Sequence, residues 1–155
     1  MIDTETLAEF SLFIAKNIAC HLDFIPADKL AWKPAPEAKS VLEILNHVLQ
    51  NFSRFKSHFE GSRRAAFKPV TTVEEAKQML FDAAEDYAQI VRTAAPEQWD
   101  RQIHVAGRSH LPLKQVATML VLDTVNHHGQ ITYIQTLLGD VQSHFDTTAF
   151  QHIAS

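Results

Sequence analysis

Four segments of this sequence carry apolar residues at intervals of three and four, the period of a helix that buries one face. They cover about residues 4–25, 41–61, 73–95 and 112–139. Twenty helical residues form a rod of about 30 Å, and four amphipathic rods must bury their apolar stripes against one another. The sequence therefore predicts an all-α fold, a four-helix bundle with long crossover connections.

Residues beside these segments indicate where two of the helices begin. Ser40 precedes Glu43 by three residues and Thr72 precedes Glu75 by three. This is the spacing of a capping box, in which each side chain bonds the other residue's backbone N–H. In the connection before the last helix, residues 102–105 could form a short extended piece.

The length of 155 residues, with 46% hydrophobic and 21% charged residues, is typical of one globular domain. We expect a single helical-bundle domain over residues 1–155, with an irregular C-terminal tail over residues 140–155. The acidic N-terminus lacks the basic segment of a secretory leader, and the single cysteine, Cys20, cannot form an internal disulfide. We therefore expect a cytoplasmic protein.

Charge and hydropathy argue against two classes of partner. A formal net charge of −4, from 14 Lys and Arg against 18 Asp and Glu, provides no basic field for a phosphate backbone. The longest wholly apolar runs, such as residues 119–122, are far shorter than the roughly 20 residues of a membrane span. We expect neither a nucleic-acid partner nor a membrane partner.

Histidine is the one anomaly in the composition, with nine among 155 residues. It is the commonest metal ligand and proton shuttle among side chains. The sequence has no glycine-rich phosphate loop, no Gly-x-Ser-x-Gly motif and no His-Glu-x-x-His motif. The positions of the histidines along the helices therefore carry the information about function.

The last helix places Asp123 and His127 four residues apart, on one face with the apolar residues Leu120 and Ile131. Such a pair on an inward face is either a hydrogen-bonded pair in the core or two ligands of one metal ion. On the second helix, His47 lies beside the apolar stripe and can reach the bundle interior. It would complete a set of two histidines and one carboxylate, which leaves coordination positions open, as in catalytic sites.

Other polar residues leave alternatives open. His128 is the rival of His127 as a ligand, although its position about 100° round the helix favours a supporting or interface role. Gly129 could allow close helix packing or leave room for a ligand, and Gln130 could bond a group in the pocket. On the second helix, the residues that could line the same cleft, or form a solvated face, are Asn51, Arg54 and His58. The histidines without ligand spacing are His21, His104, His110, His144 and His152.

Three short motifs resemble the DinB superfamily, the damage-inducible family of helical proteins that is unrelated to the DNA polymerase of the same name. They are Trp32-Lys33-Pro34-Ala35-Pro36, Leu45-Asn46-His47-Val48 and His127-His128-Gly129-Gln130. The resemblance implies a metal-binding four-helix bundle, often a homodimer. One ligand comes from the second helix and two, four residues apart, come from the last helix.

By position, the resemblance assigns the three ligands to His47, Asp123 and His127. The family more often has histidine where this chain has Asp123, and a carboxylate adds a negative charge and a harder oxygen donor. We expect a divalent metal ion, with zinc or nickel favoured and manganese or iron as further candidates.

The family includes metal-dependent transferases that use low-molecular-weight thiols. The resemblance therefore implies a metal-dependent enzyme that activates a small thiol or water for attack on a small electrophile, as an S-transferase or hydrolase would. The alternative is a non-catalytic, metal-stabilised dimeric bundle or binding module. A third interpretation is a metal-free bundle in which Asp123 and a histidine form a buried polar network.

Overall fold

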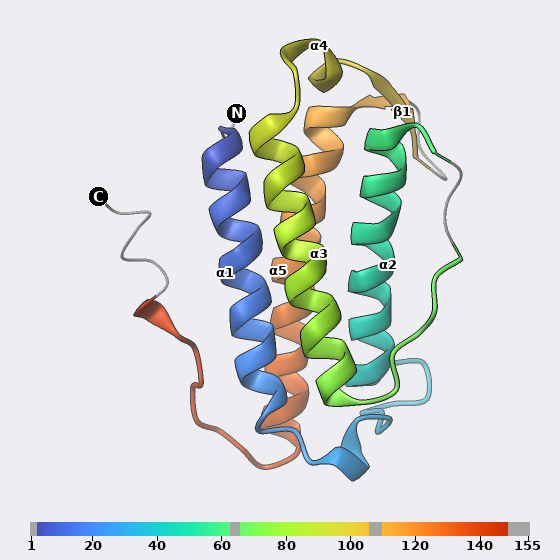
Figure 1. The fold of residues 1–155 in the computed structure, drawn as a ribbon. Coiled ribbons are helices and arrows are strands. Elements are labelled where there is room, and N and C mark those ends of the chain that lie inside the picture. The colour runs from blue at the N-terminus through green and yellow to red at the C-terminus, as the bar shows by residue number, and fades with distance from the viewer. Residues whose placement is uncertain (1–2, 63–65, 106–109, 149–155) are drawn as a thin grey trace.

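The computed structural model describes residues 3–62, 66–105 and 110–148. Its four long helices form the predicted bundle (Figure 1): α1 (Thr4–Leu22), α2 (Val41–Glu60), α3 (Val73–Thr93) and α5 (Leu113–Leu137). Helices α2 and α3 run in one direction and α1 and α5 in the other (Figure 1). The connection from α2 to α3 must therefore return along the bundle. The sequence predicted the long connections elsewhere, at residues 26–39 and 96–111, which in the structure join helices that run in opposite directions.

The remaining regular elements are short and lie in the connections. They are a 3₁₀-helix (Ala27–Lys29), α4 (Pro96–Trp99), β1 (Gln102–His104) and β2 (His110–Pro112). The strands pair antiparallel, which confirms the extended piece predicted near residues 102–105. The partner strand and the two short helices were not predicted, because elements of three or four residues carry too little periodicity.

The capping residues begin α2 and α3 as predicted, with one difference. Ser40 Oγ accepts from Glu43 N at 3.2 Å and Glu43 Oε2 accepts from Ser40 N at 2.8 Å, a complete capping box. Thr72 Oγ1 likewise accepts from Glu75 N at 3.2 Å. The predicted return bond to Thr72 was wrong, because Glu75 Oε2 accepts instead from the N–H of Thr71 at 2.9 Å.

The bundle buries one core to which all four long helices contribute. The side chain of Tyr87 on α3 lies within it, and its hydroxyl donates to the carbonyl of Ala117 on α5 at 2.9 Å. Within the described ranges, no helix is long and apolar enough to cross a membrane.

The described part of the predicted tail, residues 140–148, runs from the end of α5 back towards α1 (Figure 1). The buried amide of Asn17 accepts from Asp146 N at 2.8 Å, and Lys16 Nζ lies 2.8 Å from Asp146 Oδ2. Phe145 packs edge-on against Phe13, with ring centroids 5.3 Å apart. These contacts attach the tail to α1. Residues 149–155, with His152, lie outside the described residues. The assignment of residues 1–155 to a single domain stays a prediction.

The capping box of α2 provides a test of the fold. We expect Ser40→Ala to lower the free energy of unfolding by about 1 kcal/mol, because Glu43 N loses its acceptor. The measurement is chemical denaturation followed by circular dichroism. Ser57→Ala, which removes only a bond to the carbonyl of Ser53 in the same helix, should change it by less than about 0.5 kcal/mol. An equal loss of unfolding free energy in both variants would contradict the assignment of Ser40 as the capping residue of α2.

Candidate metal centre

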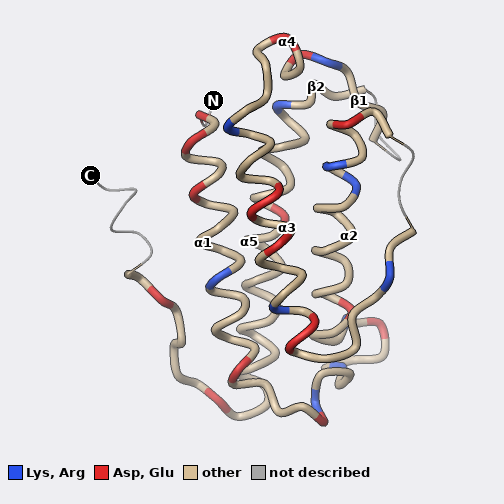
Figure 2. Tube along the Cα trace, viewed as in Figure 1, with Lys and Arg blue, Asp and Glu red and all other residues tan. Residues whose placement is uncertain are grey.

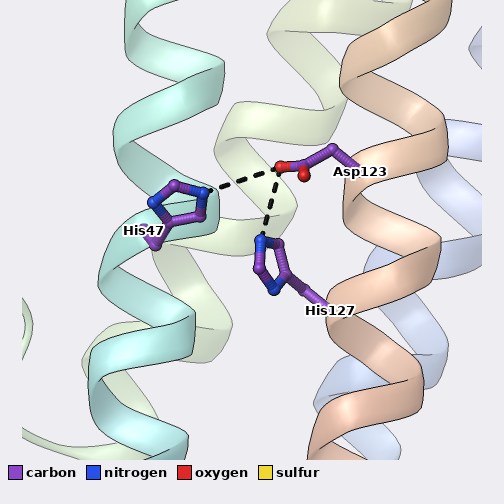
Figure 3. Close-up of side chains that lie close together, drawn as sticks. All are labelled: His47, Asp123 and His127. Carbon is purple, nitrogen blue, oxygen red and sulfur yellow. Dashed lines mark ion pairs between the residues drawn. The ribbon is translucent and has the colours of Figure 1, made fainter. Parts of the chain in front are cut away.

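The structure brings together the three side chains that the sequence singled out (Figure 3). His47 extends from α2 towards Asp123 and His127 on α5. Asp123 Oδ2 lies 3.8 Å from His47 Nε2 and 3.5 Å from His127 Nε2. One ligand atom from each residue lies within 4.8 Å of the others, and the described part of the chain contains no other such group of three. The cluster could therefore hold a metal ion.

The site lies at the edge of the packing between α2 and α5. The side chain of His127 is buried, with 7% of its surface exposed, whereas His47 and Asp123 keep 33% and 39%. The cluster is thus anchored in the bundle on one side and reachable by a small molecule on the other.

A glutamine determines which nitrogen of His127 faces the cluster. His127 Nδ1 lies 2.9 Å from Gln130 Oε1. Because an amide oxygen only accepts hydrogen bonds, Nδ1 carries the proton of the neutral ring. The lone pair of His127 then lies on Nε2, the atom nearest Asp123. Metal-binding histidines are commonly oriented by such a partner on the second nitrogen, so Gln130 does bond a group of the site.

Asn51 links the other two members of the cluster. Its Nδ2 donates to Asp123 Oδ2 at 2.9 Å and to His47 Nε2 at 3.1 Å. Arg54 Nη1 donates to Asn51 Oδ1 at 3.3 Å, which orients the amide with its N–H groups towards the cluster. His47 Nε2 is therefore an acceptor, and its lone pair takes the bond from Asn51. The amide donors satisfy the lone pairs that a cation would otherwise take.

From the sequence, Asn51 and Arg54 could either line a cleft or lie on a solvated face of α2. The spacing of four residues between His47 and Asn51 was the available signal, because it places both on the same side of α2. His58 lies eleven residues beyond His47, about 16 Å along the helix, and is not in the cluster.

Burial is the main cause that lowers the pKa of His47, and the charges of Lys39 and His127 lower this pKa further. Asp123 opposes the shift, but its effect is smaller. The lowered pKa favours the neutral imidazole, which is the form that binds a metal ion.

The rival histidine lies elsewhere. His128 is buried on another side of α5, where its ring centroid lies 4.8 Å from that of His21 on α1. Burial and the neighbouring His21 lower the pKa of His128 to about 4. The close-packing interpretation of Gly129 was wrong. Apart from its chain neighbours and the backbone of its own helix, no described atom lies within 4 Å of the place where its Cβ would be.

Comparisons with known proteins identify the family of this chain and show its fold in other proteins. A sequence model of the DinB superfamily matches residues 15–131. The chain belongs to the DinB superfamily. Two crystal structures of DinB-like proteins share its fold. The one from Bacillus subtilis has a TM-score of 0.71 and 19% identity, covering 88% of this chain and 93% of its own. The one from Bacillus cereus has a TM-score of 0.67 and 14% identity, and the match covers 84% of this chain and 90% of the Bacillus cereus chain.

At these identities the two DinB-like structures show the fold and no more. Among functionally curated proteins, none matches this chain. The function of this DinB protein must therefore be argued from its own residues.

The partner of His127 can be tested directly. We expect Gln130→Leu to weaken metal binding about 10- to 100-fold, because His127 loses the acceptor that holds its tautomer and ring orientation. Zinc titration by isothermal calorimetry measures the change. Gln115→Leu, on an exposed part of the same helix, is the matched control and should bind like wild type. If both variants kept wild-type affinity, Gln130 would have no role at the site.

Proposed function

We propose that this DinB-superfamily protein binds a divalent metal ion through His47, Asp123 and His127. We further propose that it is a metal-dependent enzyme that activates a small thiol or water for attack on a small electrophile. The observation that carries the proposal is the convergence of three lone pairs, on two imidazole nitrogens and one carboxylate oxygen, within 4.8 Å.

The donor set supports particular metals. Two imidazoles and one carboxylate suit zinc, nickel and iron, and the hard oxygen also admits manganese. We propose zinc or nickel as the physiological metal. Three protein ligands leave at least one coordination position open, as is typical of catalytic rather than structural sites.

The chemistry that a bound divalent cation supplies is to favour the deprotonated form of a small thiol or of water. The residues of this chain would hold the site and orient the substrate. Gln130 keeps the Nε2 lone pair of His127 on the cluster. Arg54, held by Gln50 Oε1 at 3.0 Å and by Asn51, places a positive charge next to the residue that bonds His47 and Asp123. That charge suits a thiol or electrophile that carries a carboxylate.

The distribution of charge supports a small-molecule substrate over a polyanion. Figure 2 shows Lys and Arg scattered among Asp and Glu rather than gathered along one face. We also propose a cytoplasmic location, for which the unpaired Cys20 is the support.

Elemental analysis of the purified protein is the first test. We expect about one bound metal ion at this site in wild type, and its loss in His47→Ala and Asp123→Ala, because each variant leaves only two ligands. His104→Ala, an exposed histidine on β1, is the control and should keep the metal. Retention of this metal in both ligand variants would contradict the proposal.

A thiol-consumption assay with electrophilic substrates then tests the catalytic part. Wild type should consume a low-molecular-weight thiol, and His47→Ala should lose this activity with its metal. If chelation instead lowers the melting temperature and no activity is found, the metal has a structural role.

One observation favours the alternative of a dimeric bundle. Helix α5 exposes four large apolar residues, Leu122, Val125, Tyr133 and Leu137. The most exposed of them are Leu122, at 58%, and Tyr133, at 64%. These residues recur at helical spacing along one side of α5. Such a stripe is typical of a surface covered by a second copy.

We therefore expect a homodimer in solution, which Leu122→Glu should shift towards the monomer by placing a charge in the interface. Light scattering coupled to size-exclusion chromatography measures the mass. Phe81→Glu, on an exposed part of α3, serves as the control and should leave the dimer intact. A monomeric wild type would contradict this part of the proposal.

A further inference from the structure

A second pair of histidines lies outside the candidate metal centre. His21 on α1 and His128 on α5 are buried, with 3% and 8% of their surfaces exposed. Their ring centroids are 4.8 Å apart, the same separation as between His47 and His127. The two pairs are thus equally close, although only the first has a carboxylate between its rings.

The Nε2 atoms of both rings in this second pair are buried without a hydrogen-bonding partner among the described residues. A buried polar atom left without a partner is costly, and such atoms in folded proteins call for an explanation. Two of them on adjacent rings from different helices indicate that something else binds there.

The tautomer of His21 follows from its neighbours. Gln135 Nε2 donates to the backbone carbonyl of Gln142 at 3.3 Å, so Gln135 Oε1 is the atom that faces His21. This oxygen lies 2.8 Å from His21 Nδ1, which must therefore be the donor. In the neutral ring the lone pair is then on His21 Nε2, the atom without a partner. Gln135 acts on His21 as Gln130 acts on His127.

A cavity of about 610 Å³ adjoins the pair, between α5 and the C-terminal tail, and both His21 and His128 line it. Its polar neighbours are Thr132, Thr136, Gln142 and Ser143. The open position at Gly129 also lies on this cavity. The cavity thus has room for water or a small ligand next to the two residues, although their Nε2 atoms are themselves buried.

A third histidine lies near the pair but is engaged elsewhere. The ring centroid of His144 is 6.0 Å from that of His21, and its Nε2 lies 2.8 Å from Asp140 Oδ2. His144 therefore contributes to the surroundings of the pair, while His21 and His128 offer the two free nitrogens.

We propose that His21 and His128 form a second metal site, for a divalent late transition-metal ion such as zinc. Imidazole nitrogen is a ligand that zinc, copper and nickel favour, and a pair without a carboxylate disfavours magnesium, calcium and manganese. Water or a small ligand in the adjoining cavity completes the coordination. Because this site has two protein ligands and no carboxylate, it binds zinc more weakly than the cluster around Asp123.

The test is the zinc stoichiometry of the full chain, measured by equilibrium dialysis and elemental analysis. We expect two zinc ions per chain in wild type and one in His21→Gln. The variant His47→Ala should also bind one, and the double variant none. His104→Gln, which removes an exposed histidine from β1, is the matched control and should keep two.

Because His21 and His128 are buried, a variant could fail to fold, so wild type itself provides a second measurement. Long-range ¹⁵N NMR of the histidine rings should show the Nε2 signals of His21 and His128 shift as the second zinc equivalent is added. The proposal is overturned if these signals do not shift. It is also overturned if wild type binds a single zinc ion that His47→Ala removes completely. Either result would leave water as the partner of these nitrogens. Zinc that is retained in His47→Ala and lost in His21→Gln would support the second site even if the first failed.

Discussion

The packing of α2 against α5 controls both the bundle and the candidate metal centre, because His47 belongs to one helix and Asp123 and His127 to the other. Both helices bury apolar residues in the shared core, among them Val48 on α2 and Ile131 on α5. This burial holds polar side chains at the edge of the interface, where they meet without full loss of solvent. The hydrophobic effect thus supplies the free energy that holds the three donor atoms within 4.8 Å of one another.

Side-chain amides bond three of the four histidines in the two pairs. Gln130 accepts from His127, Gln135 accepts from His21, and Asn51 donates to His47. At His127 and His21 the amide oxygen accepts from Nδ1 and leaves the lone pair on Nε2, whereas at His47 the amide N–H bonds Nε2 itself. An amide can do this without adding charge to the site. Amide residues thus orient three of the nine histidines of this chain.

The helices and their starts were predictable because they depend on local order along the chain. The capping box at Ser40 and the apolar periodicity of α2 involve residues at most four positions apart. Where another donor within the same range competes, the prediction failed: Glu75 bonds Thr71, four positions away, rather than Thr72. The hairpin formed by β1 and β2 was only half predicted, because strand pairing depends on two separate segments.

The order of residues along the chain is enough to place Asp123 and His127 on one face of a helix, since a spacing of four residues puts them there in any α-helix. It also indicates His47 as a candidate from another helix. The tertiary structure adds that these three residues meet, and that His128 turns away from them to His21. It alone identified Asn51 as the link between His47 and Asp123. The reason is physical: helical periodicity orients a side chain around its own axis, but only the packing of helices determines what that side chain faces.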